Sequence, residues 1–332
     1  MMSPPETKPG KQPGVVLVTG GLGYLGSQLI RDLAAEPDFA GTTIRILDNL
    51  QNENYRALMN LPAGARYQFI EGDILDPAAV RLALREVEAV IHLAAIVRTP
   101  MSFERSAWVE QVNHWGTAHL VEACLEAGVA HLILASTTAV HGPGGPFRET
   151  DPCFPQGAYA QSKRQAEVAV LAAFERGLQT TILRFGLMYG LAPIVRFEAV
   201  PNRFAYLAGV GHPLTVFGTG EQRRSLIHIR DASQAVCLAL RQPQLTSGHI
   251  LNVIDQNSSV LELVEAIRQE KPEVVVRFTE QDIRTHLSFE VDNSAILALG
   301  WQPQVSVRVG LAEVVRQFQS LAPLAMQTLD FE

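Results

Sequence analysis

The chain has 332 residues, of which 47% are hydrophobic and 18% charged, and its 27 basic against 34 acidic side chains give a net charge of -7. This composition excludes a disordered protein, and the acidic balance excludes a broad basic surface for nucleic acid. No apolar run reaches the ~18 residues of a membrane span and the first residues lack the apolar core of a signal peptide, so we expect a soluble cytoplasmic protein.

The first half of the chain alternates short β-branched runs with helical patterns. Val15–Thr19 predicts a strand, and Tyr24–Ala35 predicts a helix packed on a sheet. The same alternation predicts further strands over Thr43–Asp48, Arg66–Glu71, Ala89–Ala94, His131–Ser136 and Thr180–Phe185. Near-continuous apolar strands between helices are typical of a parallel sheet covered on both faces. The predicted fold class is therefore α/β, with a doubly wound (Rossmann) sheet.

From Leu187 onward, prolines and glycines interrupt this rhythm, which indicates a smaller C-terminal α/β part. We expect the Rossmann domain to span residues 14–186, and strands near 225–229 and 249–253 to rejoin it. The substrate-binding domain is predicted over residues 187–224 and 254–322. Residues 1–13 are predicted to form a disordered tail, and residues 323–332 a second tail.

Three glycines, Gly20, Gly23 and Gly26, lie between the first predicted strand and the first helix. Such spacing lets the backbone approach a pyrophosphate at the helix N-terminus, although an ordinary strand-to-helix turn can carry the same glycines. Asp48 ends the second strand, where a carboxylate can accept hydrogen bonds from both ribose hydroxyls and repel a 2′-phosphate. The sequence therefore predicts a dinucleotide site that prefers NAD to NADP. Asp73 either reaches the adenine amino group or caps a turn.

Tyr159 and Lys163 are four residues apart in a predicted helix, so they share one face. A neighbouring cation favours the phenolate of a tyrosine, whereas the simpler alternative is a surface tyrosine beside a solvated lysine. The chain favours arginine strongly, and Lys163 is one of only two lysines beyond the N-terminal tail. Upstream, Ser136 and Thr137 end a predicted strand, and a hydroxyl there can share a proton relay.

Taken together, seven motifs resemble those of the extended short-chain dehydrogenase/reductase family, the NAD-dependent nucleotide-sugar epimerases and dehydratases. These motifs are Gly20-x-x-Gly23-x-x-Gly26, Leu47-Asp48-Asn49-Leu50, Gly72-Asp73-Ile74-Leu75-Asp76, His92-Leu93-Ala94-Ala95, Asn113-His114-Trp115-Gly116-Thr117, Ser136-Thr137 ahead of Val140-His141-Gly142, and Tyr159-x-x-x-Lys163. The resemblance runs from Gly14 through Pro303.

The resemblance implies a role for each matching residue. Tyr159 would remove a sugar hydroxyl proton as a hydride passes to NAD, Lys163 would lower the tyrosine pKa and hold the nicotinamide ribose, and Thr137 would hydrogen-bond the reacting oxygen. The substrate would be contacted by Thr137, Thr138 and, at its diphosphate, Arg224, for which a solvated loop charge is the alternative. No metal is expected. The implied NAD contacts are Gly20, Gly23, Tyr24, Leu25, Gly26, Asp48, Asn49, Asp73, Ile74, Leu93, Ala94, Ala95, Asn113, Tyr159 and Lys163.

Three positions depart from the family pattern. Thr138 and Ala139 stand where 4,6-dehydratases carry an Asp-Glu pair, which disfavours a dehydratase of that type. Leu187 replaces a substrate-contacting Asn, which weakens the nucleotide-sugar prediction. His141 replaces a Tyr, and packing is a more common role for such a histidine than catalysis.

The predicted function is that of an NAD-dependent nucleotide-sugar epimerase acting at C4. A 4-ketosugar reductase or alcohol dehydrogenase of the same family is the alternative, and a non-catalytic NAD-sensing protein would not need Tyr159 and Lys163. The expected partner is a small molecule, with neither nucleic acid nor membrane. The resemblance also implies a homodimer formed through predicted helices over Phe103–Ala127 and Gly157–Arg176.

Overall fold

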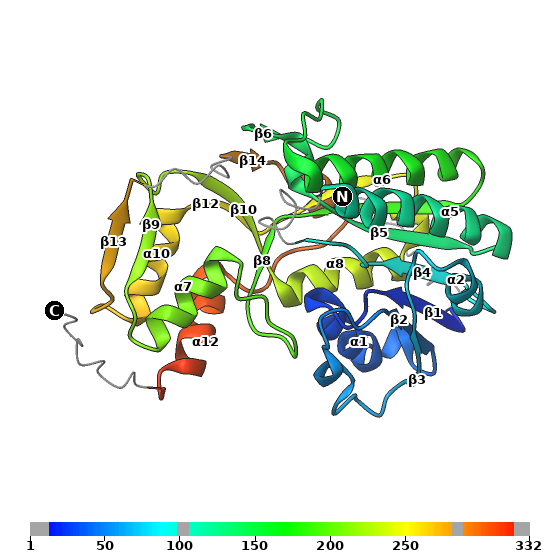
Figure 1. Ribbon diagram of the computed structural model, residues 1–332, viewed down its shortest axis with the longest axis horizontal. Helices are drawn as coiled ribbons and strands as arrows, with labels where there is room; N and C mark the ends of the chain where they lie inside the picture. Colours follow the sequence, from blue (N-terminus) through cyan, green and yellow to red (C-terminus); the bar gives the residue numbers. More distant parts are fainter. Residues whose placement is uncertain (1–12, 98–105, 281–287, 322–332) are drawn as a thin grey trace, which may run out of the picture.

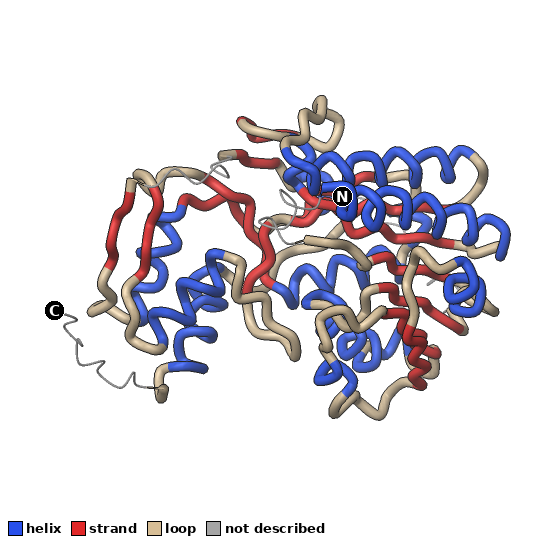
Figure 2. The backbone as a smooth tube through the Cα atoms, viewed as in Figure 1, coloured by secondary structure: helices blue, strands red, loops and turns tan. Residues whose placement is uncertain are grey.

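A computed structural model describes residues 13–97, 106–280 and 288–321 of the chain, which form two lobes (Figure 1). The larger lobe is built on a seven-stranded parallel sheet with the strand order β11-β7-β5-β4-β1-β2-β3 (Figure 2). Its strands are β1 (Val15–Thr19), β2 (Thr43–Asp48), β3 (Arg66–Glu71), β4 (Ala89–His92), β5 (His131–Thr137), β7 (Gln179–Phe185) and β11 (Ile250–Val253).

Helices cover both faces of this sheet, with α1 and α8 on one face and α2, α5 and α6 on the other. Val16 and Val18 belong to the core beneath α1, whereas Leu17 belongs to the core beneath α5 and α6. Successive strand residues point to opposite faces, so burial on both sides explains the apolar run of β1. The helices of this lobe are α1 (Tyr24–Ala35), α2 (Pro77–Ala83), α4 (Ser106–Glu110), α5 (Gly116–Ala127), α6 (Gly157–Glu175), α8 (Ile229–Arg241), α9 (Pro243–Thr246) and α11 (Ser294–Ala298).

The strand order reverses beside β1, because β2 and β3 extend the sheet to one side and β4 lies on the other. In open parallel sheets a ligand binds outside the carboxyl ends of the strands at such a reversal. Here those ends are Thr19 of β1 and His92 of β4. The fold itself therefore places the candidate site at this edge.

The smaller lobe packs three helices against short strands, and its core is separate from the two cores of the large sheet. A three-stranded sheet has the order β12-β10-β8, the pair β13-β9 completes this lobe, and a further pair, β14-β6, lies beside α6 of the larger lobe. These elements are β6 (Gly144–Phe147), β8 (Leu187–Tyr189), α7 (Val200–Gly209), β9 (Leu214–Phe217), β10 (Arg223–His228), β12 (Gln256–Ser259), α10 (Val260–Glu270), β13 (Val276–Thr279), β14 (Phe289–Val291) and α12 (Val307–Phe318).

The doubly wound α/β prediction is confirmed, and the predicted bounds of the first three strands and the first helix agree with the structure. One strand placement is wrong. The strand predicted near 249–253 does join the large sheet as β11, but the one near 225–229 is β10, which pairs with β8 and β12 instead. Strand-forming patterns alone do not identify the pairing partner, which is why this placement failed.

Other predicted strands, helices and tails differ from the structure at their ends. The strand predicted to reach Ala94 ends at His92, and the helix predicted over Phe103–Ala127 is interrupted by a π-helical turn, Gln111–Trp115; residues 103–105 lie outside the described residues. The predicted tails 1–13 and 323–332 also lie outside them, except Pro13, whose carbonyl oxygen accepts a hydrogen bond from Thr42 Oγ1 at 3.0 Å. Within the described ranges, no helix combines the length and the apolar character needed to cross a bilayer.

Candidate active site at the carboxyl edge of the sheet

The turn from β1 into α1 leaves room for a close approach of other backbone groups. Gly20 has a φ of +65°, and a Cβ on it would lie 2.6 Å from the Ala94 backbone. A Cβ on Gly26 would lie 2.5 Å from the carbonyl oxygen of Gly21, so glycine lets the first helical turn pack on the loop. α1 begins after Gly23, and no side chain in the described part of the chain caps it. Its first N–H groups and the helix dipole suit a phosphate.

Tyr24 and Leu25 lie in this first turn, but their side chains point elsewhere. The Tyr24 hydroxyl donates to the Gly190 carbonyl oxygen at 2.6 Å, and the Leu25 side chain is buried in the core beneath α1. Any contact of these two residues with a phosphate therefore comes from their backbone N–H groups.

Asp48 ends β2 beside the glycine loop. Its Oδ2 accepts the Leu22 N–H and its Oδ1 accepts the Leu50 N–H, both at 3.0 Å. Burial raises the pKa of Asp48 above its usual value, and the two backbone hydrogen bonds oppose this shift. Each carboxylate oxygen keeps a lone pair, so the group can still accept hydrogen bonds from ribose hydroxyls. The loop and the carboxylate together fit a dinucleotide.

The neighbouring predicted contacts are linked to one another. Asn49 Nδ2 donates to Asp73 Oδ2 at 2.8 Å, and Asp73 Oδ1 accepts the Leu75 N–H at 2.9 Å. Asp73 thus forms the local turn that the sequence offers as its alternative role. It also lies at the edge of the sheet where the contact with adenine is predicted. The Ile74 side chain is buried in the core and contacts the position of Gly116, so only its backbone can face a cofactor.

His92, at the end of β4, is a buried neutral link beneath the site. Thr117 Oγ1 donates to the Asn113 carbonyl oxygen at 2.6 Å, so it accepts the proton of His92 Nε2 at 2.9 Å. His92 Nδ1 then accepts from Thr19 Oγ1 at 2.7 Å. Burial, assisted by the charge of Lys163, lowers the pKa of His92 to about 3, which keeps it neutral at physiological pH. These bonds join the ends of β1 and β4 to α5.

Residues 93–95 follow β4 at the same edge and are half-buried. The loop is held by Asn113, which is fully buried in the π-helical turn. Asn113 Oδ1 accepts the Ile96 N–H at 2.8 Å, and Nδ2 donates to the Ile96 carbonyl oxygen and to Ser162 Oγ, each at 3.1 Å. Asn113 therefore holds this loop in place, and its direct contact with the cofactor stays a prediction.

Thr137, Tyr159 and Lys163 are brought together where α6 covers the end of β5. Burial raises the pKa of the Tyr159 phenol, while the charge of Arg196 and a hydrogen bond with Thr137 lower it. Lys163 lies one turn further along α6 and is only 3% exposed. Burial lowers its pKa to about 8, and the Glu167 carboxylate opposes that change. The Thr137 hydroxyl and the Arg196 charge therefore favour the phenolate, which is the form that accepts a proton, against the larger effect of burial.

The alternation of β5 separates Thr137 from its neighbour Ser136. Ser136 Oγ points to the other side of the strand and donates to Glu167 Oε1 at 2.6 Å. Glu167 also binds Arg184, whose Nε and Nη2 donate at 2.9 and 2.8 Å. This buried ion pair joins β5, α6 and β7 behind Lys163. Sequence reasoning missed it; the four-residue step from Lys163 to Glu167 is the signal that was available.

The two positions after Thr137 carry no carboxylate. Thr138 is 2% exposed, and its Oγ1 donates to the Phe185 carbonyl oxygen at 3.3 Å. Its hydroxyl is thus bonded within the protein, and its contact with the substrate stays a prediction. Ala139 donates its N–H to Thr137 Oγ1 at 3.2 Å, so the backbone here fixes the threonine.

His141 and Leu187 both serve packing. His141 is fully buried and stacks on Phe147 with ring centroids 5.2 Å apart. Arg184 Nη1 donates to His141 Nε2 at 3.2 Å, and burial lowers the pKa of His141 to about 4. Leu187 pairs with Leu226 in β10 and packs against the core of the small lobe.

Arg224 lies in β10 of the small lobe and is partly buried. Its guanidinium lies over the Phe289 ring, 5.5 Å from the centroid, and Nη1 donates to the Arg223 carbonyl oxygen at 2.8 Å. Burial lowers the pKa of Arg224 to about 10. A partly desolvated guanidinium is well suited to bind a phosphate.

Arg196 is a further residue near the site that the sequence did not indicate. It lies in the irregular segment between β8 and α7, and its Nη2 donates to the Val97 carbonyl oxygen at 3.4 Å. Its charge acts on both Tyr159 and Tyr24. An arginine in an aperiodic loop carries no pattern, so only the contact across the fold reveals it.

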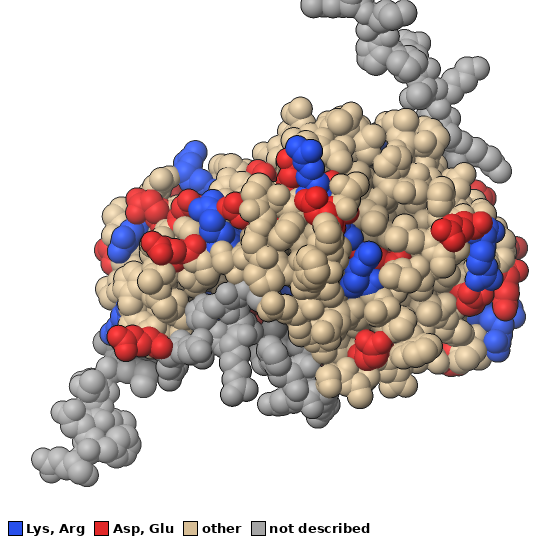
Figure 3. All heavy atoms as spheres, turned by 90° about the horizontal axis from the view of Figure 1, so that it is seen from above, with Lys and Arg blue, Asp and Glu red and all other residues tan. Residues whose placement is uncertain are grey.

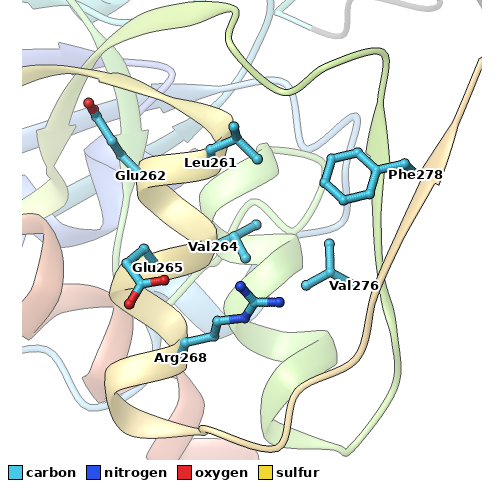
Figure 4. Close-up of a pocket in the computed structure, with 7 residues that line it drawn as sticks. All are labelled: Leu261, Glu262, Val264, Glu265, Arg268, Val276 and Phe278. Carbon is cyan, nitrogen blue, oxygen red and sulfur yellow. The ribbon is translucent and has the colours of Figure 1, made fainter.

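Other surface features lie outside this edge. On the face shown in Figure 3, basic and acidic side chains of the described residues are interspersed, and no wide basic area covers the visible atoms. A hollow between α10 and β13 has Leu261 and Val264 on one side and Val276 and Phe278 on the other (Figure 4). Its lining is largely apolar, and it belongs to the small lobe.

Comparison with known proteins agrees with a dinucleotide site at this edge of the sheet. Residues 16–253 match the NAD dependent epimerase/dehydratase family. The chain belongs to this family. It is 30% identical to dTDP-D-glucose 4,6-dehydratase of Mus musculus, covering 94% of this chain and 90% of that protein.

The solved structures agree. The dTDP-glucose 4,6-dehydratase DesIV from Streptomyces venezuelae, with NAD and TYD bound, has a TM-score of 0.82 at 28% identity, covering 92% of this chain and 97% of that one. UDP-glucose 4-epimerase of Thermus thermophilus, complexed with NAD, has a TM-score of 0.78 at 29% identity, covering 92% and 99%. The predicted family, its enzymatic character and the cofactor NAD are thereby confirmed. Because relatives include dehydratases, decarboxylases and epimerases, membership does not choose among these reactions.

Proposed function

We propose that this family member is a nucleotide-sugar epimerase that acts at C4 of the sugar. The observation that supports it is the combination of Thr137, Tyr159 and Lys163 with the side chains at 138 and 139. Removing water from a sugar requires an acid and a base beside the reacting carbons. The Thr138 hydroxyl is already bonded to the Phe185 carbonyl oxygen, and Ala139 has no titratable group. Oxidation and reduction at C4 need neither.

Bound NAD supplies the hydride acceptor, and the residues of this chain handle the proton. Tyr159 Oη, as phenolate, accepts the proton of the sugar 4-hydroxyl and returns it when the ketosugar is reduced on its other face. Thr137 Oγ1 hydrogen-bonds the same oxygen and limits its position. The ammonium of Lys163 stabilises the phenolate and binds the nicotinamide ribose hydroxyls.

The remaining residues of the site hold the two ligands. The glycine loop with the α1 N-terminus takes the pyrophosphate, and Asp48 takes the adenosine ribose. Across the site, Arg224 binds the diphosphate of the sugar nucleotide. The substrate therefore lies between the lobes, with its sugar beside Tyr159.

The test is a panel of UDP-, dTDP-, GDP- and CDP-sugars incubated with the purified protein and with its Tyr159→Phe variant. We expect a 4-epimer from the wild type and loss of turnover in the variant with nearly unchanged NAD affinity. A 4-keto-6-deoxy sugar, carbon dioxide from a uronic acid, or a stoichiometric need for added cofactor would instead indicate a dehydratase, a decarboxylase or a reductase.

We propose further that the protein is a homodimer through α5 and α6, which pack against each other. Three large apolar side chains on α6 or just before α5 are exposed: Trp115, Val168 and Phe174, at 61%, 48% and 43%. Exposed apolar side chains of this size are a feature of subunit interfaces. Sedimentation should give a dimer mass, and Val168→Glu should shift it toward the monomer; a wild-type monomer would refute the proposal.

A further inference from the structure

The segment between β8 and α7, residues 190–202, is attached to the cofactor half of the molecule. It runs from the small lobe to the start of α1, so two parts far apart in the sequence lie in contact. Its hydrogen bonds are Tyr24 Oη to the Gly190 carbonyl oxygen (2.6 Å), Arg56 Nη2 to the Pro193 carbonyl oxygen (2.6 Å), the Ile194 N–H to Ser27 Oγ (3.3 Å) and Asn202 Nδ2 to Tyr24 Oη (3.1 Å). These bonds fix the path of the segment beside the glycine loop.

Hydrogen bonds hold both the backbone and the guanidinium of Arg196. Asn202 Nδ2 donates to the Arg196 carbonyl oxygen at 3.1 Å, and Asn202 itself is fully buried. At the other end, Arg196 Nη2 donates to the carbonyl oxygen of Val97, in the loop that follows β4. The guanidinium is thus anchored across the edge of the sheet where Tyr159 lies.

We propose that Arg196 is a second cation of the active site, which stabilises the phenolate of Tyr159 in addition to Lys163. The proposal rests on the proposed function, in which Tyr159 Oη accepts the sugar hydroxyl proton. In that step the O–H bond of the sugar breaks and the phenol O–H bond forms, so one negative charge moves away from Tyr159. A fixed cation nearby favours the phenolate that begins the step.

The charged groups around Tyr159 show why a second cation is useful. Lys163 shares its ammonium charge with the Glu167 carboxylate one turn further along α6, and its pKa is about 8. His92, beneath Lys163, is neutral. An arginine remains charged at any pH at which the protein is folded, so Arg196 keeps acting on the phenol where Lys163 begins to lose its proton.

The test compares Arg196→Gln, which removes the charge, with Arg196→Lys, which keeps it but loses the forked geometry. Tyrosinate absorbance is followed during a pH titration, and the Tyr159→Phe protein supplies the background of the other five tyrosines. This readout needs no substrate. We expect Arg196→Gln to raise the midpoint of the Tyr159 titration by about one pH unit and to lower turnover at neutral pH about tenfold. Arg308→Gln, an exposed arginine of α12 in the small lobe, is the matched loss of one positive charge and should shift neither.

Arg196→Lys should restore most of the wild-type titration. Equal shifts in Arg196→Gln and Arg196→Lys would assign the residue to packing of the loop and overturn the proposal, as would an unshifted titration in Arg196→Gln. If no nucleotide sugar is epimerised but Tyr159 still shifts in Arg196→Gln, the proposed function fails while the role of Arg196 stands. If a nucleotide sugar is epimerised but the titration of Tyr159 is unshifted in Arg196→Gln, the proposed function stands and the role of Arg196 is refuted.

Discussion

Glu167→Gln is the substitution whose cost can be derived most fully from the structure. The carboxylate accepts four hydrogen bonds at 2.6 to 2.9 Å, from Ser136 Oγ, Arg164 Nη1 and both Nε and Nη2 of Arg184. The side chains of Glu167 and Arg184 are 0% and 1% exposed. Glutamine has nearly the same shape but no charge, so the variant leaves a buried guanidinium without its counterion.

Removing one partner of a buried ion pair costs about 3–5 kcal/mol. Arg184 keeps three weaker acceptors, which are His141 Nε2 at 3.2 Å, the Glu149 carbonyl oxygen at 3.3 Å and Cys153 Sγ at 3.5 Å. We therefore expect about 3 kcal/mol, the lower end of that range. Urea unfolding should show a lower midpoint with an unchanged slope.

Two comparisons make the result decisive. Glu126→Gln, an exposed position at the end of α5, makes the same chemical change and should alter stability by less than about 0.5 kcal/mol. Replacing both Glu167 and Arg184 by Met should cost less than Glu167→Gln alone, because no unpaired charge remains. A loss below about 1 kcal/mol in Glu167→Gln would refute the reasoning about this pair.

The Glu167–Arg184 ion pair also makes the stability of the fold depend on pH in the acid range. Burial alone would raise the pKa of Glu167, but the hydrogen bonds and charge of Arg184 outweigh it and hold the pKa below its usual value. A depressed carboxyl pKa stabilises the fold above the unfolded value of about 4.3 and loses that effect as the pH falls through the folded one. The stability gap between wild type and Glu167→Gln should therefore be full at neutral pH and close in acid.

Three further outcomes concern the ligand site. Asp48→Asn should narrow the preference for NAD over NADP, measured by calorimetry, because the charge that repels a 2′-phosphate is gone; an unchanged ratio would remove Asp48 from that role. Gly20→Ala should abolish NAD binding, because its Cβ would meet the Ala94 backbone, whereas Gly41→Ala, also at positive φ but with nothing in the described structure within 4 Å, should keep it. Turnover should fall as the pH rises through about 8, where the Lys163 ammonium loses its proton, and a flat profile across that pH would contradict this role.

The parts of the molecule that local patterns specify were predictable. β1, β2 and α1 have their predicted bounds because burial on two sheet faces and on one helix face leaves a direct trace in the sequence. β3 also has its predicted bounds, although it is an edge strand whose residues are half-buried or exposed. The place of Thr137 at the carboxyl edge of the sheet also follows, since parallel strands end together, whereas Tyr159 and Lys163 lie in α6. The resemblance selects Thr137 rather than Ser136, and the structure adds that the Ser136 hydroxyl is bonded to Glu167.

The parts that depend on distant contacts were not predictable. β10 pairs with β8 and β12 although nothing in its apolar run specifies those partners. Asn113 is held inside a π-helical turn, which has no simple periodicity, and its partner Ile96 is 17 residues away. Arg196 and Val97 are 99 residues apart, so the contact that places a cation near Tyr159 exists only in the folded chain.

The most direct measurement of the central claim is the fate of a deuterium label at C4 of UDP- and dTDP-glucose. A 4-epimerase in which Tyr159 handles the hydroxyl proton returns the label to C4, so we expect the opposite epimer with its deuterium retained there. Deuterium found at C6 of a 4-keto-6-deoxy sugar would contradict the account, because it requires the acid-base pair that Thr138 and Ala139 do not provide.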